Sequence, residues 1–216
     1  MNDINYRIYG RSKGRKKINL INEKFYKKII FDPKYDIIKK KNNILDIGSG
    51  NGENTIHLAN CNPNKEIIAC DKYYDGNINL CNKLIDLKLN NVKIYNDNIN
   101  KLLDELKCKN YFNEIWILFP DPWPKKRHNK RRLIDSFFLR KLYDFLNDNG
   151  KIYIATDSIM YFISILKNLH ELRNIFIWEN DIPQNWIYNK KLPKTKFFKK
   201  SQILERTVFF FELLKI

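Results

Sequence analysis

The chain has 216 residues, of which 44% are hydrophobic, and this is enough for one domain with a full core. Its formal net charge of +16 favours a polyanionic partner such as a nucleic acid, because Lys and Arg side chains that neutralise phosphates release counterions. The four cysteines form no CxxC pair and the three histidines show no metal-ligand spacing, so we expect no metal site. No apolar run is long enough to span a membrane, so we expect a cytoplasmic protein with no membrane contact.

Part of this charge has a second explanation in genome composition. The chain is rich in Lys, Asn and Ile, as expected where A and T predominate. Arginine is more informative, because only nine residues are Arg and six of them fall in two short segments, namely Arg7, Arg11, Arg15, Arg127, Arg131 and Arg132. A scarce residue type that clusters in this way indicates sites more strongly than total charge does.

The first 20 residues are polar and basic, and they show neither a helical nor a strand period. We expect residues 1–20 to form a flexible basic arm in which Arg11 and Arg15 contact RNA phosphates. A single domain is expected to follow over residues 21–216.

From residue 43, short apolar runs alternate with helical patterns. The runs predict strands at 44–47, 66–70, 92–95, 115–119 and 151–155, and the patterns predict helices at 53–60, 74–89, 131–146 and 158–169. This alternation predicts right-handed βαβ units and a doubly wound, mostly parallel α/β sheet. Two last strands, at 175–178 and 207–214, have no full helix pattern between them, which predicts one antiparallel pairing near the C-terminus.

A glycine-rich turn joins the first predicted strand to the first predicted helix. Gly48, Gly50 and Gly52 permit a tight turn and a close approach of the backbone to a ligand. The dinucleotide fingerprint would need a glycine where Glu53 stands, and Asp46 inside the strand would repel a pyrophosphate. The pattern therefore favours a cationic or neutral ligand.

Acidic residues also follow the second and third predicted strands. Asp71 stands about 20 residues after the glycine turn, the spacing at which an acid accepts hydrogen bonds from ribose hydroxyls. Asp97, after the third strand, is placed to accept a hydrogen bond from an adenine amino group. S-adenosylmethionine carries a sulfonium, an amino group, ribose and adenine, so three acids and a glycine turn fit this cofactor better than they fit ATP or NAD.

The most specific segment follows the apolar run at 115–119, which reads as a buried parallel strand. Residues 120–124 read Pro-Asp-Pro-Trp-Pro, so prolines end the strand and stiffen a loop that holds Asp121 just beyond the strand's carboxyl end. Open α/β sheets bind ligands at that edge. A cationic run follows at once, and it consists of Lys125, Lys126, Arg127, His128, Asn129, Lys130, Arg131 and Arg132. An acid beside six Lys and Arg side chains indicates an anionic polymer as the partner.

Three motifs together resemble the bacterial tRNA (guanine-N(7)-)-methyltransferase family. They are the glycine turn, the segment 119–132 and the sequence Ile-Ala-Thr-Asp at 154–157. The resemblance runs from about residue 9 to the C-terminus. It implies a Rossmann-like class I methyltransferase fold with a seven-stranded sheet, S-adenosylmethionine as donor, and formation of 7-methylguanosine at position forty-six, in the variable loop of tRNA. We expect tRNA as the partner and a monomer or weak homodimer as the working form.

The resemblance also implies roles for individual residues. The cofactor would be held by Asp46, Gly48, Gly50, Gly52, Asp71, Asp97 and Asp121, of which Asp121 is also the expected catalytic residue. Substrate contacts would come from Lys125, Asp157, Thr195, Lys196, Phe197 and Phe198. RNA contacts would come from Arg127, His128, Asn129, Lys130, Arg131 and Arg132.

The chain departs from the family pattern Thr-x-Phe/Tyr-Glu, in which the glutamate helps to hold the guanine. Phe198 stands at the glutamate position, and Lys200 stands where an arginine is usual. The grip on guanine is therefore expected to differ, whereas the fold and the donor site are not affected.

Guanine N7 carries an in-plane lone pair at neutral pH, so methylation needs alignment rather than a general base. Asp121 is then expected to stabilise the positive charge that develops on the ring. Two nearby side chains keep two interpretations each: Trp123 either stacks on a base or packs at the strand end, and His128 either contacts phosphate or is merely exposed. The target base is expected to leave its stack to reach the site.

Three alternative functions remain open. An amino-methyltransferase acting on nucleic acid would carry a second proline where Trp123 stands. A tRNA-binding homologue with weak catalysis is suggested by Phe198, and a NAD-dependent oxidoreductase is disfavoured by Glu53.

Overall fold

A computed structural model describes residues 18–36, 42–106, 108–187 and 192–216. Arg11 and Arg15, and most of the predicted basic arm, lie outside these residues.

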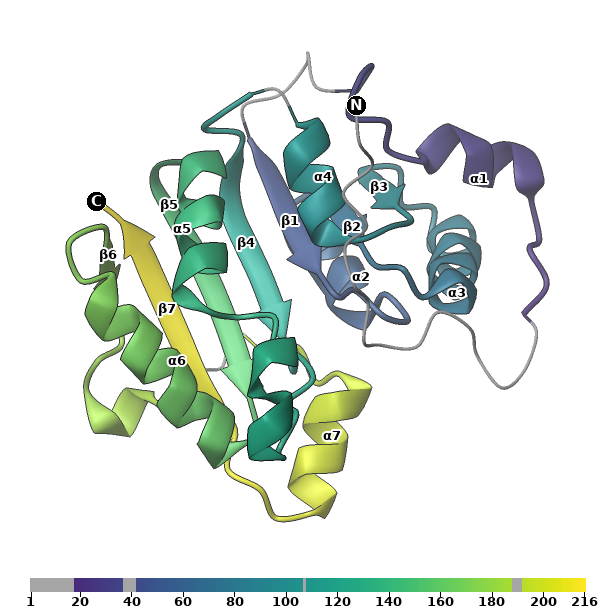
Figure 1. The fold of residues 1–216 in the computed structure, drawn as a ribbon. Coiled ribbons are helices and arrows are strands. Elements are labelled where there is room, and N and C mark those ends of the chain that lie inside the picture. Colours follow the sequence, from purple (N-terminus) through teal and green to yellow (C-terminus); the bar gives the residue numbers. More distant parts are fainter. Residues whose placement is uncertain (1–17, 37–41, 107, 188–191) are drawn as a thin grey trace. The chain divides into compact units, whose positions relative to one another are not determined.

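Seven strands form one sheet in the order β3-β2-β1-β4-β5-β7-β6 (Figure 1). The strands are β1 (Asn43–Ile47), β2 (Glu66–Cys70), β3 (Val92–Tyr95), β4 (Phe112–Leu118), β5 (Leu146–Thr156), β6 (Phe176–Trp178) and β7 (Phe209–Lys215). The pairs β2 with β3 and β4 with β5 are parallel, whereas β7 is antiparallel to both β5 and β6. The seven-stranded sheet is thus confirmed, together with the antiparallel pairing near the C-terminus.

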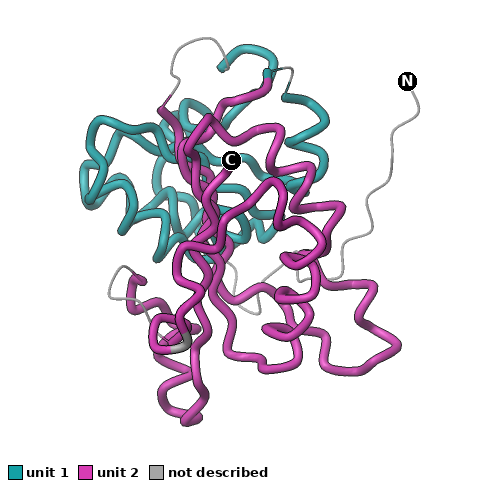
Figure 2. Tube along the Cα trace, turned by 90° about the vertical axis from the view of Figure 1, so that its left-hand side faces the viewer, with its two compact units in different colours: residues 1–40, 46–108 teal, residues 41–45, 109–216 magenta. Residues whose placement is uncertain are grey.

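The chain divides into two compact units, which are coloured separately in Figure 2. The first comprises Met1–Lys40 and Asp46–Cys108, and the second comprises Lys41–Leu45 and Lys109–Ile216.

In the first unit, strand β2 has the composition of a strand covered on both faces. Ile67, Ile68 and Ala69 are all fully buried although consecutive side chains point to opposite faces. The helices of this unit are α1 (Glu23–Ile29), α2 (Glu53–Cys61), α3 (Tyr74–Asp86) and α4 (Ile99–Glu105).

Helices α1 and α4, which have seven residues each, were not predicted from the sequence. Two turns are too few to show a helical period, but both helices have a local signal at their start. The side chain of Asn22 accepts a hydrogen bond from the Phe25 amide, and that of Asn98 accepts one from the Asn100 amide. Such caps satisfy amides that have no partner inside the helix.

The second unit contains α5 (Ser136–Phe145), α6 (Ile159–Glu171), α7 (Lys196–Ile203) and the short 3₁₀-helices η1 (Lys126–Arg131) and η2 (Pro183–Asn185). The predicted helix at 131–146 was wrong in its first turn. The Asp135 carboxylate accepts a hydrogen bond from the Phe138 amide at 2.8 Å, so α5 begins after this cap, and the basic run forms η1 instead. The apolar stripe of α5 is buried as expected, with Phe138 and Leu142 in the core.

Helix α7 occupies part of the stretch between the last two strands, where no full helix pattern was found. It has eight residues and begins after Thr195, whose hydroxyl accepts a hydrogen bond from the Phe198 amide at 3.2 Å. This short helix determines where the predicted substrate residues lie, as described next.

Candidate active site

The glycine turn of the first unit has a backbone that other residues rarely adopt. Gly48, Gly50 and Gly52 have φ values of 75°, 54° and 77°. A β-carbon at Gly52 would lie 2.4 Å from Cδ1 of Leu80, so the turn packs directly against α3. At Gly48 a β-carbon would meet no atom within 4 Å, so the turn is open there. The turn therefore presents bare backbone toward free space.

Asp46 ties this turn to the first turn of α2. Its two carboxylate oxygens accept hydrogen bonds from Nδ2 of Asn54 at 2.9 Å and from Oγ1 of Thr55 at 2.6 Å. Only 2% of Asp46 is exposed. Burial raises the pKa of Asp46 to about 6, although the hydrogen bonds from Thr55 and Asn54 act in the opposite direction. Asp46 thus fixes the glycine turn to the start of α2 from a buried position.

Asp71, at the end of β2, is bonded to the same turn. Its Oδ2 accepts a hydrogen bond from the Gly50 amide at 2.7 Å, and its Oδ1 accepts one from the Tyr73 amide at 2.8 Å. Asn77 holds the surrounding backbone, because its Nδ2 donates to the Asp71 carbonyl and to Oδ1 of Asn96, each at 2.8 Å. These bonds fix the direction of the Asp71 carboxylate at the end of β2.

Asp97 follows β3, and its surroundings favour its ionised form. Its Oδ2 pairs with Nζ of Lys101 at 2.9 Å, and its Oδ1 accepts a hydrogen bond from the Asn98 amide at 2.7 Å. Partial burial favours the neutral acid, but these hydrogen bonds outweigh it and lower the pKa of Asp97. The first unit therefore places three of the four predicted acids, Asp46, Asp71 and Asp97, at the ends of β1, β2 and β3, a negatively charged set that fits a cationic sulfonium cofactor.

In the second unit, the loop after β4 holds Asp121 out toward solvent. Asp121 is exposed, and within the described part of the chain no hydrogen bond or ion pair engages its carboxylate. The residues on either side are constrained, because Phe119 has φ 52° and Trp123 has φ 42°. Left-handed backbone at such residues is unfavourable and persists only where the surrounding structure holds it. The loop therefore presents Asp121 in a fixed direction.

Two of the predicted RNA-binding arginines hold this loop. Arg132 donates from Nε to the Pro122 carbonyl at 2.8 Å, and its guanidinium lies 5.1 Å from the ring centre of Tyr161. Arg131 lies over the ring of Trp123 at 5.0 Å. These two side chains are partly buried rather than presented to solvent.

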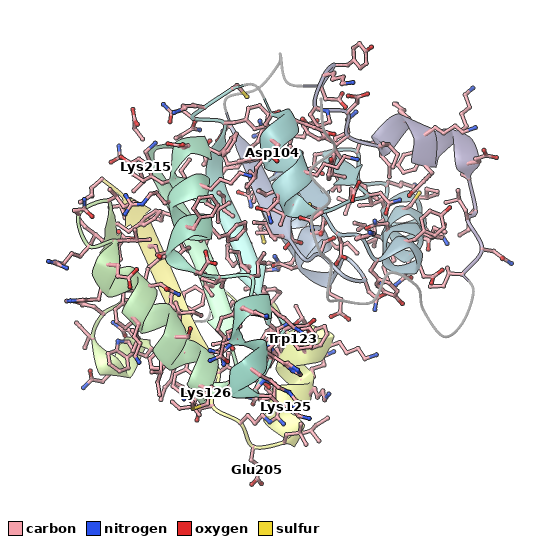
Figure 3. The ribbon with its side chains drawn as sticks, in the orientation of Figure 1. Asp104, Trp123, Lys125, Lys126, Glu205 and Lys215 are labelled. Carbon is pink, nitrogen blue, oxygen red and sulfur yellow. The ribbon has the colours of Figure 1, made fainter. Side chains whose placement is uncertain are left out.

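The rest of the basic run faces outward. Four exposed cations lie on it, namely Lys125, Lys126, Arg127 and Lys130, and Asn129 is exposed beside them. Figure 3 shows Lys125 and Lys126 at η1. The ring of His128 meets that of Trp123 edge to face at 5.8 Å. Loss of hydration and the charges of Arg131 and Lys125 lower the pKa of His128. Trp123 is half-buried, and its ring contacts Arg131 and His128 of the same basic run.

The start of α7 divides four of the six predicted substrate residues, those at 195–198, into two pairs. Thr195 and Phe198 are buried, with 7% and 6% of their surfaces exposed. Lys196 and Phe197 are exposed, and the Phe197 ring lies parallel to that of Phe119 with centres 6.3 Å apart. The side chain that stands at the family's glutamate position therefore packs in the interior.

Asp157, at the end of β5, has two partners that the sequence did not reveal. Its Oδ2 accepts hydrogen bonds from Oγ of Ser201 and from Nη1 of Arg206, both at 3.0 Å. These partners stand 44 and 49 residues away, beyond the reach of any local pattern.

The described residues hold no group of three or more His, Cys, Asp or Glu suited to a metal ion. Among the same residues, no helix combines the length and apolarity that crossing a membrane requires.

The sequence matches a family described as "Putative methyltransferase" over residues 40–211. A tRNA (guanine-N(7)-)-methyltransferase from Neorickettsia sennetsu is 32% identical over 194 residues, which are 85% of this chain and 87% of the relative. A protein of the same name from Mycoplasmopsis synoviae is 37% identical over 77% of this chain and 81% of its own length. The chain belongs to the tRNA (guanine-N(7)-)-methyltransferase family.

Solved structures confirm the fold of this methyltransferase. An rRNA methylase from Streptococcus thermophilus superposes with a TM-score of 0.54 at 16% identity, over 89% of this chain and 92% of the other. A "putative methyltransferase" from Streptococcus mutans in complex with SAH gives 0.55 at 14% identity, over 89% and 94%. At such identities the likeness concerns the fold alone, and it confirms the class I methyltransferase arrangement.

Proposed function

We propose that this chain transfers the methyl group of S-adenosylmethionine to N7 of a guanine in tRNA. The observation that carries the proposal is its similarity, over 85% of its length, to a tRNA (guanine-N(7)-)-methyltransferase. The specific target in this proposal is position forty-six in the variable loop, which the motif at 119–132 supports. We further propose that the chain works in the cytoplasm as a monomer or weak homodimer.

S-adenosylmethionine supplies an electrophilic methyl group on a positively charged sulfur. The bare backbone at Gly48 gives the cofactor a close approach, and Gly50 and Gly52 keep the turn in its left-handed form. Asp71, whose carboxylate is held at the end of β2 by the Gly50 and Tyr73 amides, accepts hydrogen bonds from ribose hydroxyls. Asp97 accepts from the adenine amino group, and Asp46 supports the turn without touching the ligand directly.

Asp121 stabilises the guanine as its ring becomes cationic. N7 needs no deprotonation, so Asp121 has no proton to remove and its negative charge is its contribution. Its carboxylate is not neutralised by any described residue, so its charge remains available for the substrate. Pro120 and Pro122, with the hydrogen bond from Arg132, limit its movement.

The exposed cations Lys125, Lys126, Arg127 and Lys130 bind the tRNA backbone on this proposal. Arg131 and Arg132 act indirectly, because they hold the loop from which these cations project. The N-terminal arm, with Arg11 and Arg15, adds phosphate contacts. Removal of residues 1–17 is expected to weaken tRNA binding and to reduce its salt dependence, and an unchanged salt slope would contradict this role.

A second candidate function is tRNA binding with weak catalysis. The observation that favours it is the buried ring of Phe198, which places no carboxylate at the family's glutamate position. This reading predicts tRNA and cofactor binding with little methyl transfer.

One experiment separates the two functions. The protein is incubated with S-adenosylmethionine and tRNA from a strain that lacks this modification, and the nucleosides are identified by mass spectrometry. We expect 7-methylguanosine, and none when the variable-loop guanine is replaced by adenine. Binding of both ligands without any methylated nucleoside would support the binding function instead.

A further inference from the structure

The inference concerns the carboxylate of Asp157 and rests on the proposed function. Its two donors among the described residues, Oγ of Ser201 and Nη1 of Arg206, reach the same oxygen, Oδ2, at 3.0 Å each. No described residue donates to Oδ1. The side chain is 21% exposed, so it is partly shielded yet open to a ligand. One oxygen is held by the protein, and the other is left as an acceptor.

The two donors are unequal. Oγ of Ser201 also lies 3.0 Å from the Phe197 carbonyl, and a hydroxyl has only one proton to donate. Ser201 can therefore serve Asp157 or Phe197 at any moment, but not both fully. Arg206 has no such competing acceptor in the described structure, and it adds a full positive charge. Arg206 is thus the constant partner of Oδ2.

The turn after α7 places Arg206 for this contact. The Arg206 amide donates to the Ser201 carbonyl at 2.9 Å and the Glu205 amide donates to the Gln202 carbonyl at 3.0 Å, the bonding pattern of a Schellman helix end. Glu205 occupies the left-handed position with φ 51°, where glycine is usual. Figure 3 shows Glu205 projecting from this turn. The strained turn brings Arg206 back beside Ser201, so that both reach Asp157.

The ion pair of Arg206 with Asp157 contributes little to the stability of the fold. The Arg206 side chain is 53% exposed, and ion pairs that solvent reaches stabilise a fold only weakly. Orientation is the larger effect, because a carboxylate held through one oxygen can no longer rotate its other oxygen away.

We infer that Arg206 is a positioning residue that fixes Asp157, so that Oδ1 accepts hydrogen bonds from the N1–H and 2-amino groups of the target guanine. With Phe198 buried, the described residues around α7 offer this carboxylate as the acceptor that replaces the absent glutamate. Adenine presents an acceptor at N1 and has no 2-amino group, so a fixed Oδ1 rejects it.

The test compares tRNA carrying guanine with tRNA carrying inosine at the target position. Inosine keeps N7 and N1–H but lacks the 2-amino group. For the wild type we expect kcat/KM to be about tenfold higher with guanine, the discrimination of one hydrogen bond of about 1.4 kcal/mol. Arg206→Ala should reduce this preference severalfold. Arg173→Ala is the matched control, because that exposed arginine donates to the His170 carbonyl and contacts no carboxylate in the described structure. It should leave the preference unchanged.

A double mutant separates positioning from other roles of Arg206. In the Asp157→Ala background, Arg206→Ala should have little further effect on single-turnover rates. An equal loss in both backgrounds, with a lower salt slope for tRNA binding, would show that Arg206 contacts phosphate and would overturn the inference. Equal losses for guanine and inosine would also overturn it. If the wild type methylates neither tRNA, the proposed function itself fails.

Discussion

Replacement of Asp121 by asparagine isolates the charge that the mechanism assigns to this residue. The side chain is exposed and no described residue bonds to it, so the change leaves no polar group unpaired and should alter the free energy of unfolding by less than about 0.5 kcal/mol. A negative charge about 4 Å from the cationic ring contributes about 1 kcal/mol in bulk water and about 4 kcal/mol at an effective dielectric constant of about 20. If bound guanine covers the carboxylate only partly, the contribution of the charge lies between these two energies. We therefore expect kcat to fall about 100-fold.

The assay is single-turnover transfer of labelled methyl groups to unmodified tRNA, with cofactor binding measured by calorimetry and stability by thermal unfolding. Asp148→Asn is the control, since the side chain of that aspartate is 87% exposed and lies near the amino-terminal end of β5. Transfer within threefold of the wild type would refute the electrostatic role of Asp121. A large loss of cofactor affinity, at unchanged Tm, would instead assign the residue to the donor.

Three further changes test other parts of the structure. Gly52→Ala should destabilise the fold by about 1–3 kcal/mol and weaken cofactor binding, because its β-carbon would lie 2.4 Å from Leu80. Gly48→Ala should cost only the backbone strain of about 1 kcal/mol, because its β-carbon would meet no atom within 4 Å. Equal losses of stability in thermal unfolding of the two variants would contradict this difference. Because the pKa of Asp46 is raised, the folded state binds more protons than the unfolded state between pH 3.8 and about 6. The wild type should therefore lose stability relative to Asp46→Asn as pH rises through that window. A gain in stability would contradict the raised pKa of Asp46. Phe198→Glu should lower Tm and leave kcat/KM no higher, because the ring is 6% exposed; a higher kcat/KM at unchanged Tm would show that this position reaches the guanine.

Local patterns were sufficient for much of the fold. Strands β2 and β3 have the predicted limits, because their apolar runs end at residues that cannot be buried in the sheet. The start of α5 was misplaced because the capping carboxylate of Asp135 lies inside a stretch whose helical period continues on both sides. Helices α1 and α4 were missed because two turns carry no measurable period.

The candidate site was predictable only where its residues are neighbours in sequence. The glycine turn and the exposed Asp121 follow from backbone chemistry and from the prolines around that carboxylate. The contacts of Asp157 with Ser201 and Arg206 span more than 40 residues and depend on how α7 packs. Likewise, no sequence pattern shows that Arg131 and Arg132 contact Trp123 and Pro122 while the other cations of the basic run face solvent.

The two left-handed residues that flank Asp121 have a consequence for attempts to stabilise the protein. Glycine at Phe119 or Trp123 would relieve the backbone, yet it would also give the unfolded chain and the loop more conformations. The chain instead retains a bulky aromatic residue at each of these places, at a cost in folding free energy. These residues hold one carboxylate in a defined direction at the expense of backbone strain, and we expect stabilising substitutions here to reduce turnover.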